Sequence, residues 1–300
     1  MITKPTVLIL GAGASMPYRF PSGRELKEKI ISRLNPRTTG VLVNSLIGLG
    51  VTEACIRSFR EELHYSGRPS VDAFLEHRSE FLEVGKLSIT HTLIQHEAEE
   101  HLFEIAGNEQ NWYEYLFNKL NAKFDELDKN KLSIITFNYD RSLEYYLFRS
   151  IKSSYGKSED ECVIKLNKIP IIHVHGSLGA LPWQGGVTRT YSPRLDQVDI
   201  RTISEQIKVI PETDETSPDF DKSYQLMKDA HRIYFLGFGY HEANLVRLKI
   251  HLLKNKMSIL GTSYGFGAAE AGVIENKWGI NCSATHLKIL EFFREWAPLE

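Results

Sequence analysis

The stretch Val7-Leu-Ile-Leu-Gly-Ala-Gly-Ala-Ser15 places a glycine-rich loop directly after a short apolar run. An apolar run of this length is typical of a strand that is buried in a parallel sheet. Glycines in the loop that follows allow backbone N–H groups to approach a pyrophosphate. We therefore take Gly11, Ala12, Gly13 and Ser15 as candidate nucleotide-binding residues.

Two further apolar runs also end in polar residues. The first precedes Thr136-Phe-Asn-Tyr-Asp140, and the second precedes His173-Val-His-Gly-Ser177. The carboxyl ends of parallel strands share one edge of a sheet, and ligands bind along that edge. The pattern therefore predicts that Asn138, Asp140 and His175 meet the glycine-rich loop in one crevice.

The rest of the chain alternates between strand and helix patterns. Strands are expected over residues 132–137, 169–174, 232–236 and 257–260, and helices over 142–148, 220–230, 244–253 and 286–296. This alternation indicates a parallel sheet with helices on both faces. Between these parts, residues 41–124 show an almost wholly helical pattern. We predict an α/β fold with a Rossmann-like parallel sheet in residues 1–40 and 125–300 and an all-helical insertion over 41–124.

Charge and composition argue against several classes of protein. The net charge of −2 gives no electrostatic reason to expect direct nucleic-acid binding. No apolar run approaches the roughly 20 residues that span a bilayer, and the first residues do not resemble a signal peptide. Cys55, Cys162 and Cys282 are far apart and form no Cys-x-x-Cys pair. We therefore expect a cytoplasmic protein without membrane contact, without a disulfide framework and without a zinc module or other metal site.

The glycine-rich loop does not match the motifs of two common nucleotide-binding classes. No Gly-Lys-Ser/Thr follows it, so the phosphate-binding lysine of P-loop ATPases is missing. Ser15-Met16 stands where the third glycine of a strict dinucleotide fingerprint is expected, and no acidic residue ends a second strand about 20 residues later. A hydride-transferring dehydrogenase is therefore disfavoured.

Several of the candidate residues also have a structural interpretation. Asp140 directly precedes a predicted helix and is well placed to cap it. His173 and His175 would share one side of a continuing strand, either as hydrogen-bonded core residues or as catalytic groups. A metal site would need at least one more ligand. Because Gly176 would let a substrate approach, His175 is favoured as the catalytic imidazole and His173 as a structural residue.

The loop over Leu178–Arg194 is a candidate lid. It contains Gly185-Gly186 and a single Trp183 among polar residues, which suits a segment that closes over a ligand.

The order of these motifs resembles the sirtuin superfamily, and most closely the sirtuin-like (silent-information-regulator-like) NAD hydrolases of bacterial anti-phage defence systems. The resemblance rests on the Gly-Ala-Gly loop, on Phe137-Asn-Tyr-Asp140 and on His175-Gly-Ser177. A further likeness is Ile233-Tyr-Phe-Leu-Gly-Phe-Gly239 followed by His241-Glu-Ala-Asn244. The resemblance lacks one feature, the four-cysteine zinc module that deacylating sirtuins usually carry.

The resemblance implies a role for each matching residue. It implies that the glycine-rich loop binds NAD and that Asn138 and Asp140 surround the nicotinamide end of NAD. It also implies that His175 supplies the catalytic imidazole. Phe20-Pro-Ser-Gly23 stands where sirtuins close a loop over the nicotinamide ribose, and Arg24 follows it without the Asp-Phe-Arg string of the family. The residues that the resemblance places near the adenosine half are Gly237, Gly239, Asn244, Gly261 and Ser263.

The resemblance also implies an activity and a setting. The expected reaction is hydrolysis of NAD, the substrate, to nicotinamide and ADP-ribose, which depletes NAD in anti-phage defence by abortive infection. The alternatives are an NAD-dependent protein deacylase or ADP-ribosyltransferase, and a catalytically silent nucleotide sensor. The resemblance further implies a homo-oligomer and a separate regulatory partner such as a HerA-type ATPase.

Overall fold

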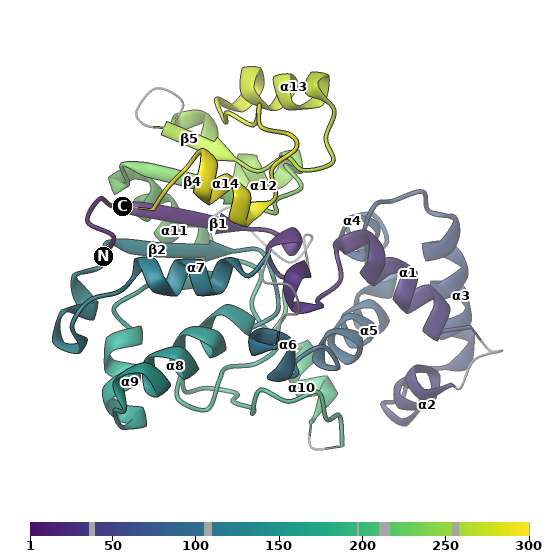
Figure 1. Ribbon diagram of the computed structural model, residues 1–300. Coiled ribbons are helices and arrows are strands. Elements are labelled where there is room, and N and C mark those ends of the chain that lie inside the picture. Colours follow the sequence, from purple (N-terminus) through teal and green to yellow (C-terminus); the bar gives the residue numbers. More distant parts are fainter. Residues whose placement is uncertain (36–39, 105–109, 197, 210–216, 254–257, 300) are drawn as a thin grey trace.

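The computed structural model describes residues 1–35, 40–104, 110–196, 198–209, 217–253 and 258–299 (Figure 1). Its centre is a five-stranded sheet in the order β3-β2-β1-β4-β5. All the paired strands run parallel, and their bounds are β1 Thr6–Leu10, β2 Leu132–Thr136, β3 Ile171–His173, β4 Arg232–Leu236 and β5 Ser258–Gly261. The predicted parallel sheet flanked by helices is therefore confirmed.

The middle strand β1 positions the site. Its neighbours are β2 on one side and β4 on the other, so the order of the strands reverses at β1. Leu10, the last residue of β1, is level with Thr136 of β2 and Leu236 of β4. The loops after these three strands therefore leave the sheet together, and a crevice forms where the order reverses.

Alternate residues of β1 face two separate hydrophobic cores. Leu8 and Leu10 belong to the core under α7 (Trp112–Lys119), α8 (Ser142–Tyr155) and α14 (Ile289–Glu295). Val7 and Ile9 belong to the core on the opposite face, where helices α11, α12 and α13 pack; their bounds are Pro218–Asp229, Glu242–Arg247 and Ala268–Trp278. A strand with both faces buried reads as a continuous apolar run, which is what the sequence shows.

A group of helices lies beside the sheet in Figure 1, next to the loop that follows β1. Its helices are α1 Gly23–Arg33, α2 Val41–Gly48, α3 Glu53–Tyr65, α4 Val71–Leu75 and α5 Leu82–Ile94. The short helix α10 (Ile200–Ser204) packs against α5, and α6 covers Glu100–Phe103. The helical group is thus not confined to residues 41–124, because α1 packs within it while α7 packs on α8 and α14 beside the sheet.

Some predicted elements differ in length from those observed. β3 ends at His173, and the predicted helix over 244–253 is α12 followed by a single 3-10 turn at Ile250–Leu252. Residue 257 of the strand predicted over 257–260 lies outside the described residues. Helices α9 (Glu159–Leu166), α10 and α13 were not predicted. For α9 the signal was present, since Ser158 and Glu161 form a capping box at its start.

None of the helices in the described part of the chain combines the length and apolar composition needed to cross a bilayer.

Candidate functional site

A cavity of about 710 Å³ opens at the carboxyl edge of the sheet. Its wall comes from the loops after all five strands and from the helical group. The sequence-predicted residues that line it are Gly11, Ala12, Gly13, Arg24, Asn138, His175, Gly237, Gly239 and Asn244. The predicted residues that do not line it are Ser15, Asp140, Gly261 and Ser263.

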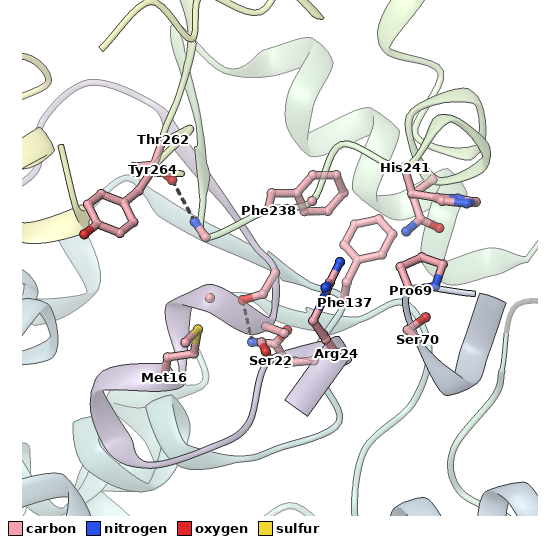
Figure 2. A pocket seen from close by; sticks show the side chains of 18 of the residues that line it. Met16, Ser22, Arg24, Pro69, Ser70, Phe137, Phe238, His241, Thr262 and Tyr264 are labelled. Carbon is pink, nitrogen blue, oxygen red and sulfur yellow. Dashed lines mark hydrogen bonds between the residues drawn. The ribbon is translucent and has the colours of Figure 1, made fainter. Parts of the chain in front are cut away.

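The cavity has two well-separated ends. Figure 2 shows Pro69, Ser70 and His241 on one side of the view, Thr262 and Tyr264 on the other, and Phe238 between them. The first end is where the helical group meets the sheet. The second lies beside the loop after β5.

The glycines after β1 and β4 bring two loops into backbone contact. A Cβ atom on Gly11 would lie 2.6 Å from the carbonyl oxygen of Gly237, and one on Gly13 would lie 2.8 Å from its Cα. Gly237 has a φ of +56°, and a Cβ there would clash with the backbone of Gly13 and Ala14. These positions need glycine because another backbone, rather than only a ligand, occupies the space of the missing side chains.

Most backbone N–H groups of the glycine-rich loop donate hydrogen bonds within the protein. The prediction that several of them are available to a pyrophosphate is therefore wrong. The N–H of Gly11 donates to the carbonyl of Leu236 (3.0 Å), and that of Gly13 donates to the carbonyl of Gly237 (2.9 Å). The N–H groups of Ala14 and Ser15 donate within the loop itself. Within the described structure this leaves the N–H of Ala12, which lines the cavity, as the backbone donor that the loop can offer to an anion.

Asn138 holds the loop through its amide nitrogen. Nδ2 donates to the carbonyl of Gly11 (3.0 Å) and to Oγ of Ser15 (3.1 Å). Both amide hydrogens are therefore used by the protein, and the group that Asn138 can offer to a ligand in the cavity is the acceptor Oδ1.

Asp140 lies behind this contact and not in the cavity wall. Its carboxylate accepts hydrogen bonds from Oγ of Ser15 (2.8 Å), from the N–H of Ser142 (3.1 Å) and from Oγ of Ser142. Burial raises the pKa of Asp140, and the hydrogen bonds from Ser142 and Ser15 oppose that rise. Arg141 is the N-cap residue of α8, so Asp140 is not the predicted cap, although its carboxylate accepts from the N–H of the first helical residue. Ser15 separates the carboxylate from the cavity. The geometry thus gives Asp140 and Ser15 positioning roles, not direct contact with a ligand.

His175 reaches the cavity from the turn after β3. Its side chain is buried, with 5% of the residue exposed, and its ring lies edge-on to Phe137 at 5.3 Å and to Phe220 at 5.9 Å between centroids. Burial, with a contribution from the charge of Arg247, lowers the pKa of His175 to about 4, while a hydrogen bond with Asn244 opposes the shift. The imidazole is therefore neutral near pH 7. Asn244 lies inside α12, whose N-cap residue is His241, so Asn244 does not cap this helix.

The two histidines do not continue one strand as expected, because β3 ends at His173. Nδ1 of His173 lies 2.9 Å from the carbonyl of Asn138, and Nε2 lies 2.6 Å from Oε1 of Glu144. Burial disfavours the protonated ring, but the charge and hydrogen bond of Glu144 outweigh it and raise the pKa of His173. His173 thus orients the backbone of Asn138, which agrees with a structural role.

A Cβ on Gly176 would clash with the backbone of Gln206, so this glycine does not clear a path for a ligand.

At the far end of the cavity, Thr262 lines the wall between Gly261 and Ser263, which do not. A Cβ on Gly261 would clash with the hydroxyl of Tyr240, and Oγ of Ser263 donates to the carbonyl of Cys282 (2.6 Å). Oγ1 of Thr262 accepts from the N–H of Gly237 (2.8 Å) and so connects this loop to the glycine turn.

Among the wall residues that sequence reasoning missed are Ser70, Asp72, Tyr264 and Lys288. Lys288 lies 5.3 Å from the ring centroid of Tyr264, so a cation and an aromatic face stand together at the far end. None of the four lies in a recognisable motif, and they come from parts of the chain that only folding brings to the sheet edge.

The predicted lid does not cover the cavity. Trp183 stacks on Phe148 at 3.8 Å between centroids, and no described residue of Leu178–Arg194 lines the wall. Arg189 pairs instead with the buried Glu97, which also binds Arg141 at 2.6 Å. This loop is therefore part of the packing that holds α5 and α6 beside the sheet.

Across the ranges that the structure describes, no group of three or more His, Cys, Asp or Glu side chains is placed to hold a metal ion.

Comparison with known proteins gives likenesses among solved structures alone. No protein-family model matches the chain, and a comparison with curated proteins gives no match. Among solved structures the chain is similar to a Sir2 homologue, a mutant in complex with 2′-O-acetyl ADP ribose, at 13% identity and a TM-score of 0.45. The likeness covers 94% of this chain and 86% of that chain. At this identity and TM-score we draw no functional conclusion from it.

Proposed function

We propose that the protein binds NAD in this cavity and hydrolyses the bond between nicotinamide and ribose, giving nicotinamide and ADP-ribose. The observation that carries the proposal is the meeting of Asn138 and His175, from loops after two different strands, beside the glycine turns in one cavity. The resemblance of the motifs to sirtuin-like NAD hydrolases supports the same substrate.

The size and charge of the cavity suit a dinucleotide. A volume of about 710 Å³ lies within the usual range of small-molecule sites. Arg24 and Lys288 bring two cationic side chains to its wall, and cations of this kind favour a pyrophosphate. The N–H of Ala12 adds a neutral donor to the wall.

The chemistry of NAD explains why the site needs no pair of catalytic carboxylates. The nicotinamide of NAD is already a pyridinium, and it leaves as a neutral molecule when its bond to ribose breaks. The leaving group therefore needs no general acid, unlike that of ordinary glycosides. The protein must orient the ring, tolerate an oxocarbenium-like ribose and place a water molecule.

Asn138 and His175 can share these tasks. Oδ1 of Asn138 is the free acceptor that can orient a water molecule or a ribose hydroxyl, since Nδ2 is held by the glycine-rich loop. His175 is neutral and can take a proton from the attacking water. A pKa of about 4 makes it a weak base, but a water molecule that bonds to an oxocarbenium carbon becomes strongly acidic, so a weak base suffices.

The proposal is tested by chromatography of NAD incubated with the purified protein, with Asn138→Ala and with His175→Ala. Nicotinamide and ADP-ribose are expected in equal amounts with the wild type, and removing either catalytic group should reduce the rate about 100-fold or more. His251→Ala is the matched control, because His251 is exposed and does not line the cavity. Equal thermal midpoints would show that the variants are folded.

Other outcomes would point to the alternative functions. Nucleotide that binds without turnover would favour a sensor, and transfer of ADP-ribose to a protein or loss of an acyl group would favour a transferase or deacylase. Full activity of His175→Ala would refute the mechanism.

We further propose that the activity depletes NAD in the cytoplasm during anti-phage defence. An unrestrained NAD hydrolase would drain its own cell, so we expect control by homo-oligomerisation and by a separate partner such as a HerA-type ATPase. Light scattering on the protein alone and with the candidate ATPase tests this: a monomer in both cases would contradict it.

A further inference from the structure

The helical group contributes part of the wall at one end of the cavity. Pro69, Ser70, Asp72 and Ala73, at the start of α4, all line it. Ser70 is used by the protein, because its Oγ accepts from the N–H of Ala73 (3.1 Å). Asp72 is thus the acidic side chain that this wall presents.

Asp72 is linked to the loop that carries Asn138. The hydroxyl of Tyr139, the residue after Asn138, donates to Oδ1 of Asp72 at 2.5 Å. The other carboxylate oxygen, Oδ2, accepts a hydrogen bond from no other residue in the described part of the chain. One acceptor of Asp72 is therefore used to connect α4 to the sheet, and one remains for a ligand.

The electrostatic setting of Asp72 is unusual for a carboxylate. Burial raises its pKa, which the hydrogen bond from Tyr139 only partly offsets. Asp72 forms no ion pair with a Lys, Arg or His among the residues that the structure describes, and its neighbours in the wall include the apolar Pro69, Ala73 and Phe137. Asp72 is partly buried, and a partly buried carboxylate without a cation is stabilised by a ligand that brings positive charge and a hydrogen-bond donor.

We propose that Asp72 binds the nicotinamide end of NAD, accepting a hydrogen bond from the carboxamide NH2 and attracting the positive ring. This inference rests on the proposed function and adds a specificity residue that lies outside the strand-end motifs. It fills a role that Asp140 does not fill here, because Ser15 separates Asp140 from the cavity. The chemical class that Asp72 selects is a cationic pyridinium carboxamide.

Two consequences follow from the charge. The oxidised dinucleotide should bind more tightly than NADH, whose nicotinamide ring is neutral. After cleavage the ring is also neutral, so the attraction that holds it is lost and nicotinamide is released. Because the positive charge moves from the ring to the ribose during cleavage, loss of Asp72 should raise KM more than it lowers kcat.

The experiment measures equilibrium binding of NAD, NADH and ADP-ribose by calorimetry to the wild type, Asp72→Asn and Tyr139→Phe. Asp72→Asn keeps the size of the side chain and an acceptor for Tyr139, but removes the charge. We expect it to weaken NAD binding about tenfold and to leave ADP-ribose, which has no nicotinamide, nearly unchanged. Asp229→Asn is the matched control, since Asp229 is exposed at the end of α11 and does not line the cavity.

Tyr139→Phe separates ligand binding from a structural role. If Asp72 acts only by holding Tyr139, Tyr139→Phe will weaken binding of NAD and of ADP-ribose alike, whereas Asp72→Asn, which keeps the acceptor, will bind NAD as well as the wild type does, and the inference is overturned. If Asp72→Asn does not fold, the wild type still gives a decision: equal affinity for NAD and NADH would overturn the inference, and a preference for NAD would support it.

The failure of this inference can be told from failure of the proposed function. Wild-type protein that binds neither NAD nor ADP-ribose would overturn both. Wild-type protein that hydrolyses NAD, with Asp72→Asn binding it equally well, would overturn the inference alone.

Discussion

The two sides of the cavity are lined by different kinds of groups: mainly backbone on the sheet side, and side chains on the side of the helical group. On the sheet side, Gly11, Gly13 and Gly237 bring backbone against backbone, and the loop donors are mostly used within the protein. On the side of the helical group, the wall is made of side chains, including Asp72. The first side is fixed by the fold and offers little choice of residue, whereas the second can change its chemistry without changing the sheet. The shape of the cavity thus comes from the strand ends, and under the proposed function its specificity would come from the helical group.

A buried charge cluster joins the two sides. Glu97, after α5, accepts from Arg141, which precedes α8, and from Arg189. The side chains of Glu97 and Arg141 are 0% and 1% exposed. Because unpaired buried charges are strongly unfavourable, this cluster fixes how the helical group sits against the sheet.

The largest effect is expected from Gly237→Ala on the sheet side. The added Cβ meets the backbone of Ala14 at a residue with a φ of +56°, so we expect a loss of about 4 to 6 kcal/mol in the free energy of unfolding. Gly239→Ala is the control, because a Cβ there has no heavy atom within 4 Å. Urea unfolding measures both variants. If Gly237→Ala and Gly239→Ala were equally stable, the contrast between the two sides would be wrong, because backbone contact would then not determine the shape of the sheet side of the cavity.

Glu97→Gln tests the junction between the sides. It leaves Arg141 and Arg189 buried with their shared charge partner removed, and we expect a loss of about 3 kcal/mol. Glu126→Gln serves as the control, because the Glu126–Lys129 pair is exposed, and its midpoint should not change measurably. A Glu97→Gln variant as stable as the wild type would show that the two sides are held together by apolar packing alone.

The smallest effect is expected from a change of pH between 6 and 8. The pH dependence tests whether His175, on the sheet side of the cavity, stays buried and neutral during turnover. The pKa of His175 is lowered to about 4, so its imidazole stays neutral from pH 6 to 8 and becomes protonated only as the pH falls toward 4. The kcat for NAD hydrolysis should therefore be nearly constant from pH 6 to 8 and fall below about pH 5. A midpoint near 6.5 would instead indicate a solvated histidine with an ordinary pKa, and the buried setting of His175 would then not persist during turnover.

Much of the sheet could be predicted from local sequence. Val7-Leu-Ile-Leu10 is apolar at every position because both of its faces are buried, and this is visible without any partner strand. The positions of Asn138 and His175 at the cavity also follow from a local rule, because residues after parallel strands gather at one edge. Helix α9 was missed although the capping box at its start, formed by Ser158 and Glu161, is a local sequence pattern.

The sequence by itself determined the type of sheet and which strand ends carry polar residues, because side-chain periodicity and turn residues act over a few positions. Only the tertiary structure decided that Ser15 shields Asp140, that Gly261 packs under Tyr240 and that Asp72 joins the cavity. These outcomes depend on contacts between segments far apart in the chain, such as Asp72 with Tyr139, 67 positions away. Whether a polar side chain faces a ligand or another residue depends on which distant segment packs against it in the folded protein. A local sequence pattern contains no information about that segment.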